Sequence, residues 1–192
     1  MNEMKVEGNK TVSETVKDRG TPISHTSEHS SSDKSGVHGI CGGNKTQIGF
    51  EAGRTIELKQ YEFCRIRLGL RLRLPDSVNK ETAKEAARQF VDEMLKREES
   101  AVQGGDYATQ ITDETKAVLS NCVCRCIKVL YGLTLKSGSN KFESHQVDII
   151  EELPVSDGAD LVAEFESLSS EMAEDLDKEH NRIKGKDKDT GL

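Results

Sequence analysis

The sequence predicts an α+β domain: a four-stranded antiparallel sheet with two helices packed on one of its faces. Residues 65–74 alternate almost strictly between arginine and aliphatic side chains, as a strand with one buried face does. Apolar residues at helical spacing follow this strand. The order strand, turn, strand, helix then occurs a second time. We therefore expect a duplicated strand-strand-helix unit, with repeats at 47–102 and 122–183 and a linker at 103–121.

In the first repeat, residues 48–58 alternate apolar side chains with Gly, Glu and Thr, which predicts a half-buried strand. The arginine strand, residues 65–74, ends at Pro75 because proline has no N–H to donate to the sheet. A helix is expected to follow, with Asn79 as its N-cap. The apolar residues of this helix are Ala83, Ala86, Ala87, Phe90, Val91, Met94 and Leu95.

In the second repeat, strands are expected at 123–135 and 142–153, joined by a turn at 137–140. A helix should begin after 157–160, where acidic residues suit the positive end of the helix dipole. The linker is expected to hold a short helix near 113–119. The apolar residues of the last helix are Leu161, Phe165, Leu168, Met172, Leu176 and Ile183.

The two ends of the chain differ from this domain in composition. Residues 1–46 and 184–192 contain no aromatic residue, so we expect disordered tails around a single domain at 47–183. The net charge of −7 is unevenly spread, because 145–185 is strongly acidic while the arginine strand is basic. No apolar run has membrane-spanning length. Five cysteines without a signal-peptide pattern predict reduced thiols and a cytoplasmic location.

The arginine strand is the strongest functional signal. Its guanidinium groups share one strand face, and each can donate paired hydrogen bonds to phosphate oxygens. This pattern favours a non-enzymatic protein that binds single-stranded DNA or RNA, with aromatic side chains stacking on the bases. The residues predicted to bind nucleic acid are Arg54, Arg65, Arg67, Arg71, Arg73, Tyr61 and Phe63.

Two other interpretations of the same face stay open. If the repeats pair across a pseudo-twofold axis, Asp148 and Glu152 become cross-strand partners that neutralise Arg67 and Arg71. Arginine is also enriched at the energetic centres of protein interfaces. The alternative function is therefore a protein–protein interaction module, or an inhibitor acting on a host protein, and the chain could form a homodimer.

The sequence gives little evidence for a metal site or for catalysis. Cys122, Cys124 and Cys126 would share one strand face, but zinc needs about four tetrahedral ligands. Further ligands would have to come from Cys41, Cys64, His38 or His145. The histidines are scattered, and no nucleophile–base pair or cofactor loop is present. We expect no metal, no cofactor and no catalytic residue, and the cysteines are interpreted as core residues.

Residues 54–70 read Thr-Ile-x-Leu-x-x-Tyr-Glu from Thr55, followed by an alternating strand and a charged helix. This stretch resembles small uncharacterised proteins of phages and other mobile elements. The resemblance implies an accessory protein in a prokaryotic or viral setting and no particular activity. The duplicated sheet-plus-helix plan is also similar in architecture to the Pur and Whirly single-strand binders, which present a sheet face to DNA. Those proteins have four strands before each helix, whereas two are predicted here.

Overall fold

The computed structural model describes residues 9–17, 46–59, 62–136 and 144–189. Its elements, in chain order, are β1 (Asn9–Lys17), β2 (Gln47–Lys59), β3 (Glu62–Arg73), α1 (Lys80–Val102), α2 (Asp113–Ser120), β4 (Val123–Lys136), β5 (Ser144–Val155) and α3 (Leu161–Asp189). Tyr61 and the turn expected at 137–140 lie outside the described residues. The α+β class and the four predicted strands are confirmed, and the linker helix is α2.

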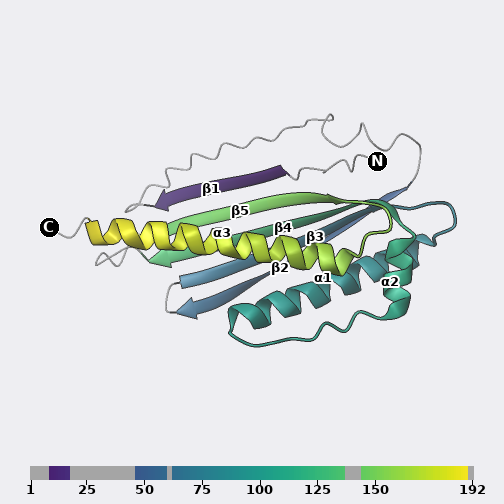
Figure 1. Cartoon of the computed structure of the whole chain (residues 1–192), viewed down its shortest axis with the longest axis horizontal. Helices are drawn as coiled ribbons and strands as arrows, with labels where there is room; N and C mark the ends of the chain where they lie inside the picture. The colour runs from purple at the N-terminus through teal and green to yellow at the C-terminus, as the bar shows by residue number, and fades with distance from the viewer. Residues whose placement is uncertain (1–8, 18–45, 60–61, 137–143, 190–192) are drawn as a thin grey trace, which may run out of the picture.

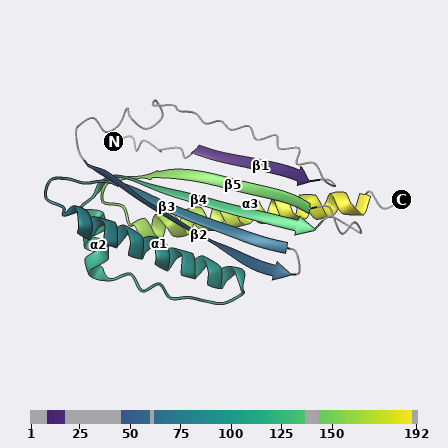
Figure 2. The same ribbon diagram turned by 180° about the vertical axis from the view of Figure 1, so that it is seen from behind.

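The strands form one antiparallel sheet in the order β1-β5-β4-β3-β2. Each long helix packs on the hairpin that precedes it: α1 on β2 and β3, and α3 on β4 and β5. In Figure 1, α3 crosses in front of the strands, and Figure 2 shows the opposite face of the sheet with α3 behind it. One face of the sheet is therefore covered by helices, and we call the other the open face.

The core lies between the sheet and the two long helices. The aliphatic residues of the arginine strand are buried beneath the helices. The predicted apolar residues of α1 and α3 are buried on the sides of the helices that face the sheet. Phe90 of α1 and Phe165 of α3 meet edge to face, with ring centroids 6.4 Å apart. Complete burial of each such side chain contributes about 1.5–3 kcal/mol. Alternation along the strands and helical spacing along the helices therefore build one continuous core.

The predicted helix starts are confirmed. The side-chain oxygen of Asn79 accepts hydrogen bonds from the backbone N–H groups of Glu81 and Thr82, at 2.9 and 3.2 Å. At the start of α3, Asp160 Oδ1 accepts a hydrogen bond of 2.9 Å from the N–H of Val162. These caps define the residue at which each helix begins.

The structure differs from the expected tails at both ends. Asn9–Lys17 forms β1, which pairs with β5 along its length. An edge strand is held by main-chain hydrogen bonds, so it needs none of the aromatic residues whose scarcity suggested disorder. Helix α3 also continues to Asp189, past the predicted end at 183. The remaining tail residues lie outside the described part of the chain.

Candidate functional site

The open face presents the arginines of β3 between a carboxylate of β2 and two carboxylates of β5. On β3, Arg65, Arg67 and Arg71 alternate with the buried aliphatic residues, as predicted. The neighbouring strand β2 supplies Glu51 to this face. Strand β4 supplies the cation Lys128, and β5, which lies beyond β4, supplies the carboxylates of Asp148 and Glu152. Positive and negative charges are thus interleaved across four strands.

Three of the four arginines of β3 form ion pairs with described residues of the chain. The pairs, with their closest N–O distances, are Arg65–Asp148 at 2.7 Å, Arg67–Glu51 at 3.6 Å and Arg71–Glu152 at 3.6 Å. The predicted pairing of Glu152 with Arg71 is confirmed, whereas Asp148 pairs with Arg65 and not with Arg67. The reason is strand order: β4 lies between β3 and β5, and its register places Asp148 in line with Arg65.

A glycine in β4 allows the closest of these pairs to form. Gly132 lies opposite Arg65 on one side and Asp148 on the other. A Cβ atom at this position would lie 2.2 Å from Asp148 Oδ1 and 3.1 Å from Arg65 Nε. Any side chain would therefore occupy the space in which the ion pair closes. The glycine lets two side chains from non-adjacent strands meet above the strand between them.

A second glycine has a similar place two rows further along the open face. Gly69 of β3 lies between Glu51 of β2 and Lys128 of β4. A Cβ atom there would touch Glu51 Cγ at 3.5 Å and Lys128 Cβ at 3.6 Å, which is ordinary van der Waals contact. Lys128 in turn lies 3.7 Å from Glu152. Charged side chains thus stand on both sides of each glycine and connect the strands laterally.

The ion pairs surround an apolar centre and stay accessible to solvent. Leu130 and Ile150 are cross-strand partners in the same row as Arg67, and both are only partly buried. The side chains of Arg67 and Arg71 are 60% and 49% exposed. The open face therefore combines a small apolar centre with a charged rim of both signs.

The other predicted binding residues do not all share one face. Arg73 is the last residue of β3, where it pairs with Gln47 of β2 and has the parity of the open-face arginines. Phe63 lies in line with Thr134 next to the row of Arg65, where it is partly buried. Arg54 faces the helices, because it has the same parity as the buried residues of β2, and it pairs with Glu99 of α1 at 2.9 Å. Arg54 therefore lies on the other side of the sheet from Arg65, Arg67 and Arg71. Tyr61 lies outside the described residues.

Sequence reasoning missed Arg125 on β4. The register with β3 shifts between Arg71 and Arg73, and this bulge contains Cys124, whose φ is 49°. Arg125 is directed toward the covered side of the sheet and is only 2% exposed. An arginine that interrupts the apolar, inward-facing positions of a strand was the signal in the sequence.

The cysteines do not form the regular row expected of them. Cys122 precedes β4 and its thiol donates to Val118 O at 3.3 Å, while the bulge displaces Cys124 from its expected strand position. Cys124 is disulfide-bonded, so the expectation of reduced thiols throughout is wrong at this residue. Burial raises the pKa of the Cys64 thiol to about 11 and also raises that of Cys126, which disfavours the nucleophilic thiolate.

The described part of the chain contains no group of three or more His, Cys, Asp or Glu side chains placed to hold a metal ion. No helix within the described ranges has both the length and the apolarity needed to cross a membrane. No protein-family model matches the chain, and neither a curated protein nor a solved structure matches it significantly. Function must therefore be argued from the geometry of these surfaces.

Proposed function

We propose that this protein is a non-enzymatic interaction module that binds another protein through the open face of its sheet. The observation that carries the proposal is the pairing of Arg65, Arg67 and Arg71 with carboxylates of the same chain. A polyanion lying on this face would also lie against those carboxylates. A protein surface can offer both signs of charge, so it suits an interleaved face better than a nucleic-acid backbone does.

The anatomy of the face supports the same conclusion. Protein interfaces commonly have an apolar, well-packed centre and a polar rim, and arginine is enriched in them relative to the rest of the surface. Here Leu130 and Ile150 form the apolar centre, and the ion pairs form the rim. The expected partner is a protein surface with an apolar protrusion bordered by charges of both signs.

Single-stranded nucleic acid is the second candidate ligand. Arg67 and Arg71 keep about half or more of their side-chain surface exposed, and Phe63 is available on the same side of the sheet. Binding of this kind would release counterions, so the logarithm of the affinity would fall steeply with the logarithm of the salt concentration. A protein interface centred on Leu130 and Ile150 would lack such a slope.

The test compares the parent chain with Ile150→Asp, which charges the apolar centre but leaves the arginines in place. Proteins captured from cell extract are identified, and the affinity of the purified candidate is then measured at several salt concentrations. We expect at least tenfold weaker binding of the candidate by the variant. Lys84→Gln on the exposed side of α1 serves as the matched control and should bind like the parent.

A fluorescent single-stranded oligonucleotide is tested in parallel with Arg67→Gln/Arg71→Gln. Oligonucleotide binding by the parent, with a salt slope that this double variant reduces by about 1.4, would favour nucleic acid and reject the protein-interface proposal. A captured protein that binds Ile150→Asp as tightly as the parent would reject it as well.

A further inference from the structure

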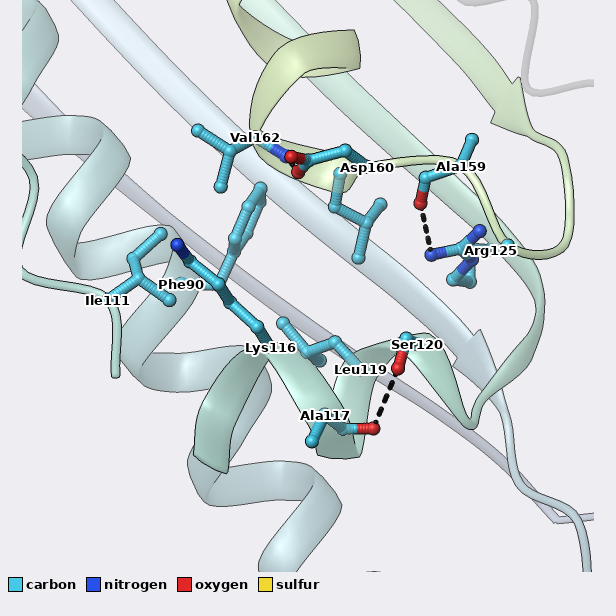
Figure 3. Close-up of a pocket in the computed structure, with 12 residues that line it drawn as sticks. Phe90, Ile111, Lys116, Ala117, Leu119, Ser120, Arg125, Ala159, Asp160 and Val162 are labelled. Carbon is cyan, nitrogen blue, oxygen red and sulfur yellow. Dashed lines mark hydrogen bonds between the residues drawn. The ribbon is translucent and has the colours of Figure 1, made fainter. Parts of the chain in front are cut away.

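A cavity lies on the covered side of the sheet, where α1, α2, the start of β4 and the N-terminus of α3 meet (Figure 3). Its volume is about 260 Å³. Its walls are mainly apolar, and the apolar side chains include Phe90, Ile111, Leu119, Leu161 and Val162. The polar side chains at its edge are Lys116, Ser120, Arg125 and Asp160. A mainly apolar pocket with a few polar groups is the usual form of a small-molecule site.

Arg125 is the unusual member of this lining. Its Nη1 donates to Ala159 O at 2.9 Å and its Nη2 donates to Ser156 O, while its buried Nε has no hydrogen-bond partner. Within the described residues, no carboxylate lies within ion-pair distance of this guanidinium. Carbonyl oxygens satisfy two donors but supply no negative charge. A buried cation normally has an anionic partner, because leaving its charge uncompensated is costly.

The surroundings of Arg125 add positive potential. The two carbonyls that it contacts belong to the turn leading into α3, so the guanidinium lies near the positive end of a long helix. Asp160 also borders the cavity, but its carboxylate caps α3 through the N–H of Val162. Lys116 contributes a second cation with no ion pair to any described residue. The lining thus holds two cations against one carboxylate that is already engaged.

We propose that this cavity binds a small organic carboxylate with a short apolar body. The carboxylate compensates the charge of Arg125, and the apolar body packs against Phe90, Leu119 and Leu161. The volume lies just below the range typical of drug-sized ligands, which limits the body to about the size of a six-carbon chain. In Figure 3, Arg125 and the amino group of Lys116 lie on different sides of Leu119. The site is on the opposite side of the sheet from the open face, so it is independent of the proposed function.

The first experiment titrates the whole protein with hexanoate and, separately, with hexan-1-ol, which has the same chain but no charge. Amide NMR signals of Leu119, Ser120 and Val162 report occupancy. We expect saturable shifts with hexanoate, affinity at least tenfold weaker for hexan-1-ol, and a melting temperature that rises with hexanoate concentration. Equal affinity for the two compounds, or no shift with hexanoate up to about 10 mM, overturns the proposal. Arg125 would then serve only to hold the turn before α3.

The second experiment uses variants of the cationic groups. Arg125→Met keeps an unbranched apolar side chain and removes the guanidinium charge, so the response to hexanoate should disappear. Lys116→Gln is at an exposed position and removes the second cation of the lining, so it should weaken hexanoate binding less than Arg125→Met does and leave the fold unaltered, whereas Lys84→Gln, outside the cavity lining, should leave binding unchanged. If Arg125→Met does not fold, the hexanoate and hexan-1-ol affinities of the parent and of Lys116→Gln decide the question. Unchanged hexanoate binding by folded Arg125→Met contradicts the proposal.

Discussion

Arg67 and Arg125 lie on opposite sides of the same sheet and in opposite environments. Arg67 is 60% exposed and lies 3.6 Å from the carboxylate of Glu51. Arg125 is 2% exposed and meets only backbone carbonyls among its described hydrogen-bond partners. The open face carries arginines that pair with carboxylates of neighbouring strands, whereas Arg125 on the covered face lies among mainly apolar side chains.

The two environments predict different contributions to the stability of the fold. Exposed ion pairs such as Arg67–Glu51 contribute little to the free energy of folding, since water screens them and long side chains lose entropy. Under the proposed function, this arrangement serves contact with a partner rather than stability. Buried polar groups affect stability much more, because each one must be hydrogen-bonded or compensated. The predictions below test this contrast, from the largest expected effect to the smallest.

The largest effect is expected from a buried hydroxyl on the covered face. Tyr131 donates to the carboxylate of Glu98 and lies 2.9 Å from Ser169 Oγ. Burial, together with the negative charge of Glu98, raises the pKa of Tyr131 far above its usual value, so the hydroxyl stays protonated. Tyr131→Phe leaves the buried carboxylate without this donor and should cost about 1–3 kcal/mol in urea denaturation.

Tyr107→Phe is the matched control for this measurement. Tyr107 also donates to a buried carboxylate, Glu93 Oε2, at 2.9 Å. Glu93 keeps two other donors, Lys96 Nζ at 2.7 Å and the N–H of Gln110 at 2.8 Å. The control should therefore lose less than about 1 kcal/mol. Equal losses for the two variants would show that burial of the hydroxyl does not decide its contribution.

A smaller effect is expected on the open face at Gly132. A methyl group in Gly132→Ala displaces the carboxylate of Asp148 and breaks its pair with Arg65, at a cost of about 1 kcal/mol. Gly69→Ala introduces only ordinary contacts and should change stability by less than about 0.5 kcal/mol. In an Asp148→Ala background the cost of Gly132→Ala should vanish, which a double-mutant cycle measures. A cost that persists there would place its origin in the backbone.

The smallest effect is confined to acid pH. Burial alone would raise the pKa of Glu93, but hydrogen bonds from Lys96, Gln110 and Tyr107 outweigh it and hold the pKa below its ordinary value. A carboxylate with a lowered pKa stabilises the fold above its unfolded-state pKa, and this contribution is lost as pH falls through the folded-state value. Glu93→Gln should therefore lose less stability than the parent between about pH 5 and pH 2. Parallel stability curves for the two proteins would contradict this expectation.

Local pattern was sufficient to predict most of the fold. The alternation in the arginine strand predicted which side chains are buried, and helical spacing predicted the inner faces of α1 and α3. Asn79 was identified as a cap, and the last helix was predicted to begin after 157–160, because capping depends on neighbouring residues alone. The same parity rule, applied to β2, places Arg54 beside Ile56 on the covered side. The separation of Arg54 from the arginines of β3 therefore follows from the sequence pattern.

The candidate sites depended on information that is not local. Sequence alone determined that the arginines of β3 share a face opposite the core, because side-chain direction in a strand follows from the backbone period of two. Only the tertiary structure decided which carboxylates they meet, since the pairing of Arg65 with Asp148 requires β4 to lie between β3 and β5 with Gly132 in the same row. It also decided the burial of Arg125, which results from a bulge and from the turn that closes over it before α3. Strand order and register are long-range properties of the whole chain, and a window of neighbouring residues does not encode them.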